Sequence, residues 1–261
     1  MKIYIFVDME GISGVSGSDY VKSDGRLYAT ARRYYTWDVN ACVKGCLQGG
    51  ANDVIVRDGH GSGNHLILED MDPAVEVVHG STGAVRMAGL DECAGLILLG
   101  YHAMAGTRGA LLEHTYSSAS IQNMWMNGRR VGEVGIDAGI ATDRNIPTIL
   151  VTGDDYVCRE AKDWIPGVVT CEVKKGLSCQ GARLLSLAEA HRRITEATAE
   201  AVRQVGTIKP MPVDRPVTMR VEVIERGGIP NEISRRGVRV LDGRTYEATA
   251  ETVEAALFAV L

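Results

Sequence analysis

The feature that most constrains the fold is a regular alternation of short β-rich runs with helical stretches through the first two-thirds of the chain. Strands are predicted at residues 2–7, 53–57, 94–100 and 147–152, and helices at residues 26–48 and 134–145. Strands that alternate with helices form βαβ units, in which successive strands run parallel and helices cover the sheet. The pattern therefore predicts an α/β fold with a mainly parallel sheet flanked by helices.

The pattern changes after residue 155. A long helix is predicted at 184–205, a connection with three prolines at 209–216, and an alternating strand at 217–225. Residues 238–241 are a candidate partner for that strand, and residues 248–261 have helical composition. We expect a catalytic α/β domain over residues 1–180 and a smaller α+β portion over residues 181–261.

Charge and hydropathy exclude two classes of partner. The net charge is −5 and the Lys and Arg residues are dispersed, so the sequence lacks the basic footprint of a nucleic-acid-binding protein. The apolar run at residues 3–7 ends at Asp8, which is too short for a secretory signal or a membrane span, and no later run is long enough. The sequence therefore predicts a cytoplasmic protein that binds neither nucleic acid nor membrane.

Carboxylates and imidazoles follow the predicted strands where each strand ends. Asp8 and Glu10 follow the first strand, Asp58 and His60 the second, and His102 the third. Sites in open α/β sheets form beyond the carboxyl ends of the strands. Asp8 and Glu10 are two apart in extended chain, so their side chains point the same way. We expect these groups to converge at one edge of the sheet.

His114 and Glu133 come next along the chain, and glycines flank most of these positions. Taken singly, each residue is typical of a turn or a helix cap. Taken together, two or three carboxylates and two histidines suit a pair of zinc or manganese ions. The role of Asp58 stays open between orienting His60 and capping a turn.

Five motifs in order along the chain resemble the bacterial D-aminopeptidase family, which includes a protein that accompanies a dipeptide-transport operon. They are VDMEGISG at 7–14, RDGHG at 57–61, LGYHAMAGT at 99–107, EHTYS at 113–117 and NGRRVGEVGIDAGIA at 127–141. Any one of these motifs is weak, but all five in this order are highly specific. The resemblance runs from residue 1 to about 155 and weakens towards the C-terminus.

The resemblance implies a peptidase with two zinc ions per chain, although manganese or another divalent metal would suit the same ligands. It also implies a short peptide substrate with an N-terminal D-amino acid, and a ring-shaped homo-oligomer. His114 matches the family's catalytic histidine, and Asp8 is the carboxylate best placed to be shared by two ions. The positions that match the family's metal ligands are Asp8, Glu10, His60, His102 and Glu133.

Two other classes of function stay open on the residues alone. The same ligands would suit another two-metal hydrolase, such as an amidase or a phosphoesterase. A non-catalytic peptide-binding or scaffold protein could keep the fold, but we would then expect at least one ligand position to be lost, and none is.

Overall fold

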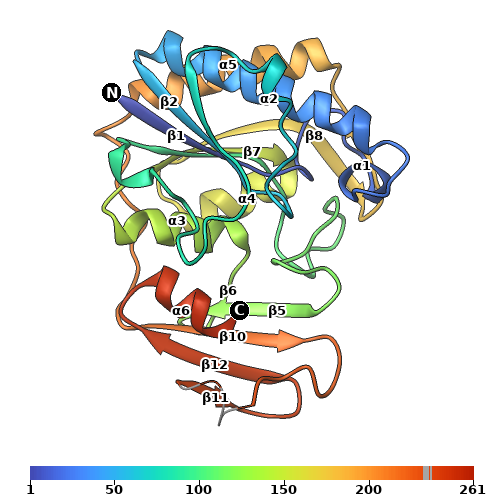
Figure 1. Cartoon of the computed structure of the whole chain (residues 1–261), viewed down its shortest axis with the longest axis vertical. Coiled ribbons are helices and arrows are strands. Elements are labelled where there is room, and N and C mark those ends of the chain that lie inside the picture. The colour runs from blue at the N-terminus through green and yellow to red at the C-terminus, as the bar shows by residue number, and fades with distance from the viewer. Residues whose placement is uncertain (232–234, 236) are drawn as a thin grey trace.

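The computed structural model describes residues 1–231, 235 and 237–261, and it is built around two sheets (Figure 1). The larger sheet has seven strands, in the order β3 (Val75–Val78), β2 (Asp53–Asp58), β1 (Lys2–Val7), β4 (Leu96–Tyr101), β7 (Thr148–Asp154), β8 (Val169–Ser178) and β9 (Gly181–Leu184). All neighbouring strands are parallel except β8 and β9. The predicted α/β fold with a mainly parallel sheet is confirmed.

The strand order reverses between β1 and β4. From β1 the chain moves outward through β2 to β3, and it then returns to pair β4 with the other side of β1. Such a reversal leaves a crevice at the carboxyl ends of the two central strands, where α/β proteins place their sites. Asp8 follows β1 directly and His102 follows β4, so two of the predicted site residues flank this crevice.

Helices cover both faces of the larger sheet. On one face lie α2 (Tyr28–Gly49) and α5 (Leu187–Arg203), and on the other lie α3 (Glu133–Asp143) and α4 (Asp155–Trp164) (Figure 1). Successive residues of β1 enter two different cores, since Ile5 packs on the α2 and α5 side and Tyr4 on the α3 and α4 side. Burial on both faces explains why the central strands are almost entirely apolar.

The second sheet is antiparallel and lies beyond α3 and α4 (Figure 1). Its five strands are β11 (Val238–Val240), β12 (Thr245–Ala250), β10 (Val217–Val223), β5 (Ile121–Met126) and β6 (Arg129–Arg130). The C-terminal helix α6 (Val253–Val260) shares a hydrophobic core with β10, β12 and α3. The division at residue 180 stays a prediction about folding units. The second sheet contains strands from both sides of this division, because β5 and β6 precede residue 180 and its other strands follow it.

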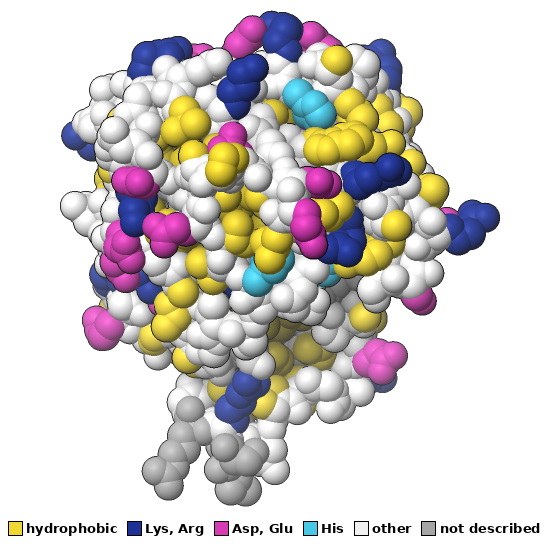
Figure 2. Space-filling view, turned by 45° about the horizontal axis from the view of Figure 1, so that its top comes forward, with side chains coloured by type: hydrophobic (Ala, Val, Ile, Leu, Met, Phe, Trp, Pro, Cys, Tyr) yellow, Lys and Arg dark blue, Asp and Glu magenta, His cyan; other side chains and the backbone are white. Residues whose placement is uncertain are grey.

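The remaining elements are short. They are α1 (Ser18–Val21) and two 3₁₀ turns at Leu68–Asp70 and Leu90–Glu92. Within the described residues, no helix combines the length and the apolar character needed to cross a bilayer. In Figure 2 the larger unit forms a rounded body from which the smaller sheet projects, and acidic and basic side chains are interspersed over the face shown.

Two predictions for the C-terminal region are wrong. The segment predicted as a helix from residue 248 begins inside β12, and α6 starts only at Val253, after Thr252 caps its first turn. The predicted partner of the 217–225 strand is also wrong, because β12 lies between β10 and β11. Tyr246 and Ala248 are buried in the core of the second sheet. Such packing overrides the weak helical preference of an alanine-rich segment.

The hairpin of β5 and β6 was not predicted, although the sequence contains its signal. Asn127 and Gly128 form the turn, with φ angles of 50° and 81°. Positive φ at both central residues is characteristic of the two-residue turns that join hairpin strands, and Asn-Gly is the pair that best tolerates it.

Candidate metal centre

Asp8 and Glu10 lie on the loop that leaves β1, and backbone contacts with β4 hold this loop in place. The Asp8 amide donates to the Leu99 carbonyl at 2.8 Å, and the Gly11 amide donates to the Gly100 carbonyl at 2.7 Å. A Cβ atom on Gly11 would lie only 2.0 Å from the Tyr101 carbonyl oxygen. Only glycine permits this approach, so the loop and the end of β4 can meet at the crevice.

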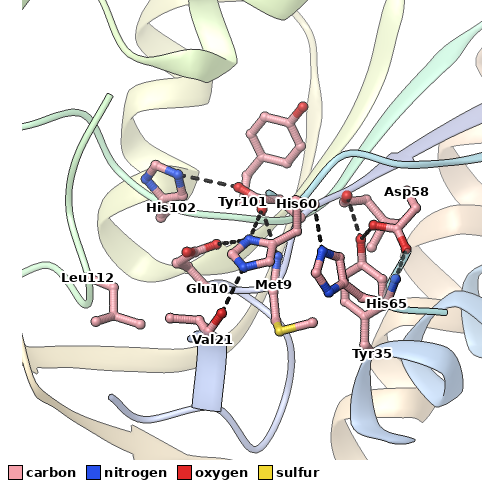
Figure 3. A network of polar contacts seen from close by, with 12 residues as sticks. Met9, Glu10, Val21, Tyr35, Asp58, His60, His65, Tyr101, His102 and Leu112 are labelled. Carbon is pink, nitrogen blue, oxygen red and sulfur yellow. Dashed lines mark hydrogen bonds and ion pairs between the residues drawn. The ribbon is translucent and has the colours of Figure 1, made fainter. Parts of the chain in front are cut away.

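The first group of candidate ligands consists of Asp8, Glu10 and His60. The His60 Nδ1 atom lies 3.0 Å from Asp8 Oδ1 and 3.2 Å from Glu10 Oε2. Figure 3 shows His60 between Glu10 and Val21, with its ring turned towards the carboxylate. One donor atom from each of the three residues lies within 4.8 Å of the others.

The second group is formed around Glu133, the first residue of α3. The His102 Nε2 atom lies 3.3 Å from Glu133 Oε1 and 3.3 Å from Asp8 Oδ2. His114 stacks on His102 with ring centroids 4.0 Å apart, and its Nε2 atom lies 3.8 Å from Glu133 Oε1. Asp8 therefore faces both groups, with one carboxylate oxygen directed to each.

Each of the three histidines directs one nitrogen into the centre and the other to a backbone carbonyl. The outward nitrogens lie close to the carbonyls of Val21 for His60 (2.9 Å), Ala103 for His102 (3.1 Å) and Leu112 for His114 (2.9 Å). A carbonyl can only accept, so the outward nitrogen carries the proton. The inward nitrogen of a neutral ring then presents a lone pair, which is the arrangement that metal-binding histidines use.

The residues fit a bound cation for a second reason. Glu10 Oε2 and His102 Nε2 are buried atoms that, among the described residues, have contacts within the cluster but no hydrogen bond. Buried polar atoms are normally satisfied, and those without a hydrogen bond in the protein call for a partner such as an ion or water. Three carboxylates and imidazole nitrogens form a donor set that suits zinc.

The proximity of opposite charges shifts several pKa values. Burial alone would lower the pKa of His60, but the carboxylates of Glu10 and Asp8 outweigh it and raise the pKa to about 12. The pKa of His102 is likewise raised well above its ordinary value, against the effect of burial, by Asp8 and Glu133. Burial favours the neutral form of Glu133, yet the His102 imidazole, 3.3 Å away, lowers the pKa of Glu133 to about 2. Without metal, protonated His60 and His102 therefore lie beside the ionised carboxylates of Asp8 and Glu133.

The centre opens into a cavity of about 530 Å³, within the range of small-molecule sites. Asp8, Glu10, His60, His114 and Glu133 all line it. A larger groove of about 1020 Å³ lies between α2 and α5 but contains none of the candidate ligands. The smaller cavity is therefore the functional candidate, because chemistry and concavity coincide there.

The whole chain, residues 1–261, matches the sequence model of a family described as D-aminopeptidase. The chain belongs to the D-aminopeptidase family. It is also 37% identical over 220 residues to the D-aminopeptidase of Bacillus subtilis (strain 168), a match that covers 83% of this chain and 80% of that protein. The resemblance seen in the five motifs is thereby confirmed.

A solved structure of a D-aminopeptidase matches the fold over nearly its whole length. It is the Zn-dependent D-aminopeptidase DppA from Bacillus subtilis, described as a self-compartmentalizing protease. The TM-score is 0.94 at 32% sequence identity, and the match covers 99% of this chain and 95% of that one. The second sheet, where the sequence resemblance was weakest, is therefore part of the shared fold.

The structure brings all six predicted site residues of this D-aminopeptidase family member together, and it assigns a local role to Asp58. The Asp58 carboxylate accepts hydrogen bonds from the amides of His65 (2.6 Å) and Leu66 (3.0 Å) and from the Tyr35 hydroxyl (2.9 Å). Asp58 thus shapes the loop after β2 by satisfying its backbone, which is the turn-capping alternative (Figure 3).

Sequence reasoning missed two buried residues that support the centre. His65 lies in the loop after β2, where it is buried and its Nε2 atom lies 2.7 Å from the His60 carbonyl oxygen. Lys174 on β8 donates to the carbonyls of Glu10 and Val15 at 2.8 Å each. Lys174 is buried directly after the buried Val173, where the pairing with β7 shifts register, so simple alternation along β8 gives no signal that it points inward.

Proposed function

We propose that this chain is a zinc-dependent aminopeptidase that removes an N-terminal D-amino acid from short peptides. The observation that carries the proposal is the position of Asp8, whose two oxygens face two separate groups of histidine and carboxylate. Asp8, Glu10 and His60 would hold one ion, and Asp8, His102 and Glu133 the other. Two such ions, when bound, supply Lewis acidity and make water a nucleophile near pH 7.

His114 is the residue we assign to proton transfer. Its Nδ1 atom is held by the Leu112 carbonyl, so its Nε2 lone pair faces the cavity beside Glu133. It can accept a proton from the attacking water and return it to the leaving amine, or stabilise the oxyanion between these steps. Stacking on His102 fixes the plane of the ring.

Family membership favours the peptidase over an amidase or a phosphoesterase, and the complete set of candidate ligands argues against a non-catalytic scaffold.

The assembly proposed here is a ring-shaped homo-oligomer, supported by the description of DppA as self-compartmentalizing. Light scattering on a sizing column would test it, since a monomer of 28.1 kDa is the contrary result. The cytoplasmic location inferred from the N-terminal residues also remains a prediction.

The decisive experiment combines metal analysis with hydrolysis of D-Ala and L-Ala p-nitroanilides, with and without added zinc. We expect about two zinc ions per chain and zinc-dependent release of p-nitroaniline, faster from the D-substrate. The matched variant is His114→Ala, which should retain zinc but lose about 10²-fold or more in kcat. Bound zinc without cleavage of either substrate would contradict the aminopeptidase proposal. Absence of zinc after reconstitution would contradict the proposed metal centre.

A further inference from the structure

Arg86 lies at the edge of the candidate metal centre and lines the same cavity. Its Nε and Nη2 atoms contact the two carboxylate oxygens of Asp137 at 2.5 and 3.0 Å. The guanidinium carbon lies 4.9 Å from the centre of the Phe6 ring and 4.7 Å from that of Tyr116. The Nη2 atom is also 3.5 Å from Glu133 Oε2, so Arg86 sits beside a proposed ligand.

These contacts hold the Arg86 guanidinium in place but leave one of its nitrogen atoms without a hydrogen bond in the described part of the chain. Asp137 engages Nε and Nη2, whereas Nη1 makes no hydrogen bond with any residue in the described part of the chain. The side chain of Arg86 remains 19% exposed, and it lines the cavity. Arginine keeps its charge at any physiological pH, and its planar fork matches a carboxylate. Arg86 is therefore a rigid, partly unsatisfied donor that faces the substrate space.

A short peptide brings one group that needs such a donor. The cavity is lined by Asp8, Glu10 and Glu133, which suit metal ions and an α-amine but repel a carboxylate. In a dipeptide the terminal carboxylate lies about 4 Å from the scissile carbonyl, because consecutive Cα atoms are only about 3.8 Å apart. A protein group that binds this terminal carboxylate must therefore lie close to the metal centre. Arg86 does so, because its Nη2 atom is 3.5 Å from Glu133 Oε2.

We infer that Arg86 binds the C-terminal carboxylate of the substrate, so that the enzyme selects dipeptides with a free C-terminus. This inference rests on the proposed aminopeptidase function and deepens it by naming the substrate class. Lys22 is the other cationic side chain of the cavity besides the histidines, but it is exposed on the turn after α1. Immobilising its long side chain would cost more conformational entropy than using an arginine that is already held.

The test compares D-alanyl-D-alanine with its C-terminal amide, using the full-length zinc-loaded protein. The wild type is expected to show a kcat/KM at least about tenfold higher for the free acid, since a charged hydrogen bond of this kind is worth about 10- to 100-fold. In the double variant Arg86→Gln/Asp137→Asn, which removes both buried charges together, the ratio should fall towards one. In Arg86→Lys, which keeps the charge but loses the fork, it should be intermediate.

The ratio separates this role from a structural one. If Arg86 only positions Glu133, its replacement lowers both rates and leaves the ratio unchanged, which overturns the inference. Equal rates for acid and amide in the wild type overturn it too, and this result needs no variant to fold. Lys22→Met is the matched control, because collapse of the ratio there would assign the carboxylate to Lys22 instead.

The failure of the underlying function is distinguishable from failure of the inference. D-Ala p-nitroanilide has no carboxylate, so its cleavage reports on the hydrolase alone. If the wild type cleaves the anilide but shows no preference for the acid dipeptide, Arg86 is not the selecting residue. If the wild type cleaves neither, the aminopeptidase proposal fails, and the inference fails with it.

Discussion

Asp8 has a position that distinguishes it from the other carboxylates of the centre. Its Oδ1 atom faces His60 and its Oδ2 atom faces His102, whereas Glu10 and Glu133 each belong to one group. Burial alone would raise the pKa of Asp8, but the imidazoles of His102 and His60 beside it lower the pKa well below its usual range. The carboxylate is therefore ionised and oriented before any metal arrives.

Asp8→Asn should remove more metal than Glu10→Gln. Loss of the shared carboxylate weakens both proposed ion sites, so zinc content should fall from about two per chain to well below one. Loss of Glu10 weakens only the site with His60 and should leave about one ion. Elemental analysis after dialysis measures both variants, and equal stoichiometry in the two would contradict the bridging role.

Zinc binding should release protons. Neighbouring carboxylates raise the pKa of both His60 and His102, so both rings are protonated at pH 7 in the metal-free protein. A histidine that binds zinc must be neutral, so each of these two rings should release about one proton when the metal binds. Zinc affinity should therefore fall as the pH falls. Titration calorimetry in buffers of different ionisation enthalpy measures the number. His60→Asn should release fewer protons, and an unchanged number would contradict the assignment.

Residues at the ends of strands and helices stabilise the loops that form the candidate metal centre. Asp154 ends β7 and caps α4, where its Oδ1 atom accepts from the amides of Tyr156 and Val157. Its Oδ2 atom accepts from the Leu111 amide at 3.0 Å, on the loop that leads to His114. Asp154 therefore caps α4 and at the same time holds the loop that leads to His114.

Asp154→Ala should lower the free energy of unfolding by about 1–3 kcal/mol, because the cap is lost and the buried Leu111 amide has no acceptor. It should also reduce kcat by loosening the loop before His114. Asp163→Ala, at an exposed position near the end of the same helix, is the control and should stay within about 0.5 kcal/mol. Denaturant unfolding measures both, and equal stabilities would argue against the cap.

Elements that precede residue 180 pack against elements that follow it in both parts of the molecule. β5 pairs with β10, and the buried Met124 and Met126 of β5 belong to the core that also contains α6 and α3. On the other side, α5 packs against α2, and the Thr195 hydroxyl donates to the Ala41 carbonyl. Glu133 itself begins α3, which lies between the two sheets.

A fragment of residues 1–180 is therefore not expected to fold alone. It would lack α5, leaving one face of α2 uncovered, and it would lack β10, leaving β5 as an exposed apolar edge. We expect aggregation or a loss of cooperative unfolding, measured by solubility and circular dichroism against the full chain prepared in parallel. A soluble fragment with a sharp thermal transition would instead support the division at residue 180.

Much of the larger sheet was predictable because its signals are local. The apolar runs at β1, β4 and β7 and the cap at Asp154 depend on residues within a few positions of one another. The second sheet was harder, because β12 runs into an alanine-rich segment that continues as α6, and it takes its conformation from its pairing with β10 and β11. The β5–β6 hairpin is local in origin, because its turn is set by the Asn127–Gly128 pair.

The sequence by itself determined which side chains end the strands and, through the five motifs, which family they belong to. Only the tertiary structure decided that Asp8 faces two groups, that Lys174 holds the Glu10 carbonyl and that Arg86 lies beside Glu133. The reason is physical. Local patterns specify the conformation of neighbouring residues, whereas contacts between residues 51 to 164 positions apart arise from packing in the assembled fold.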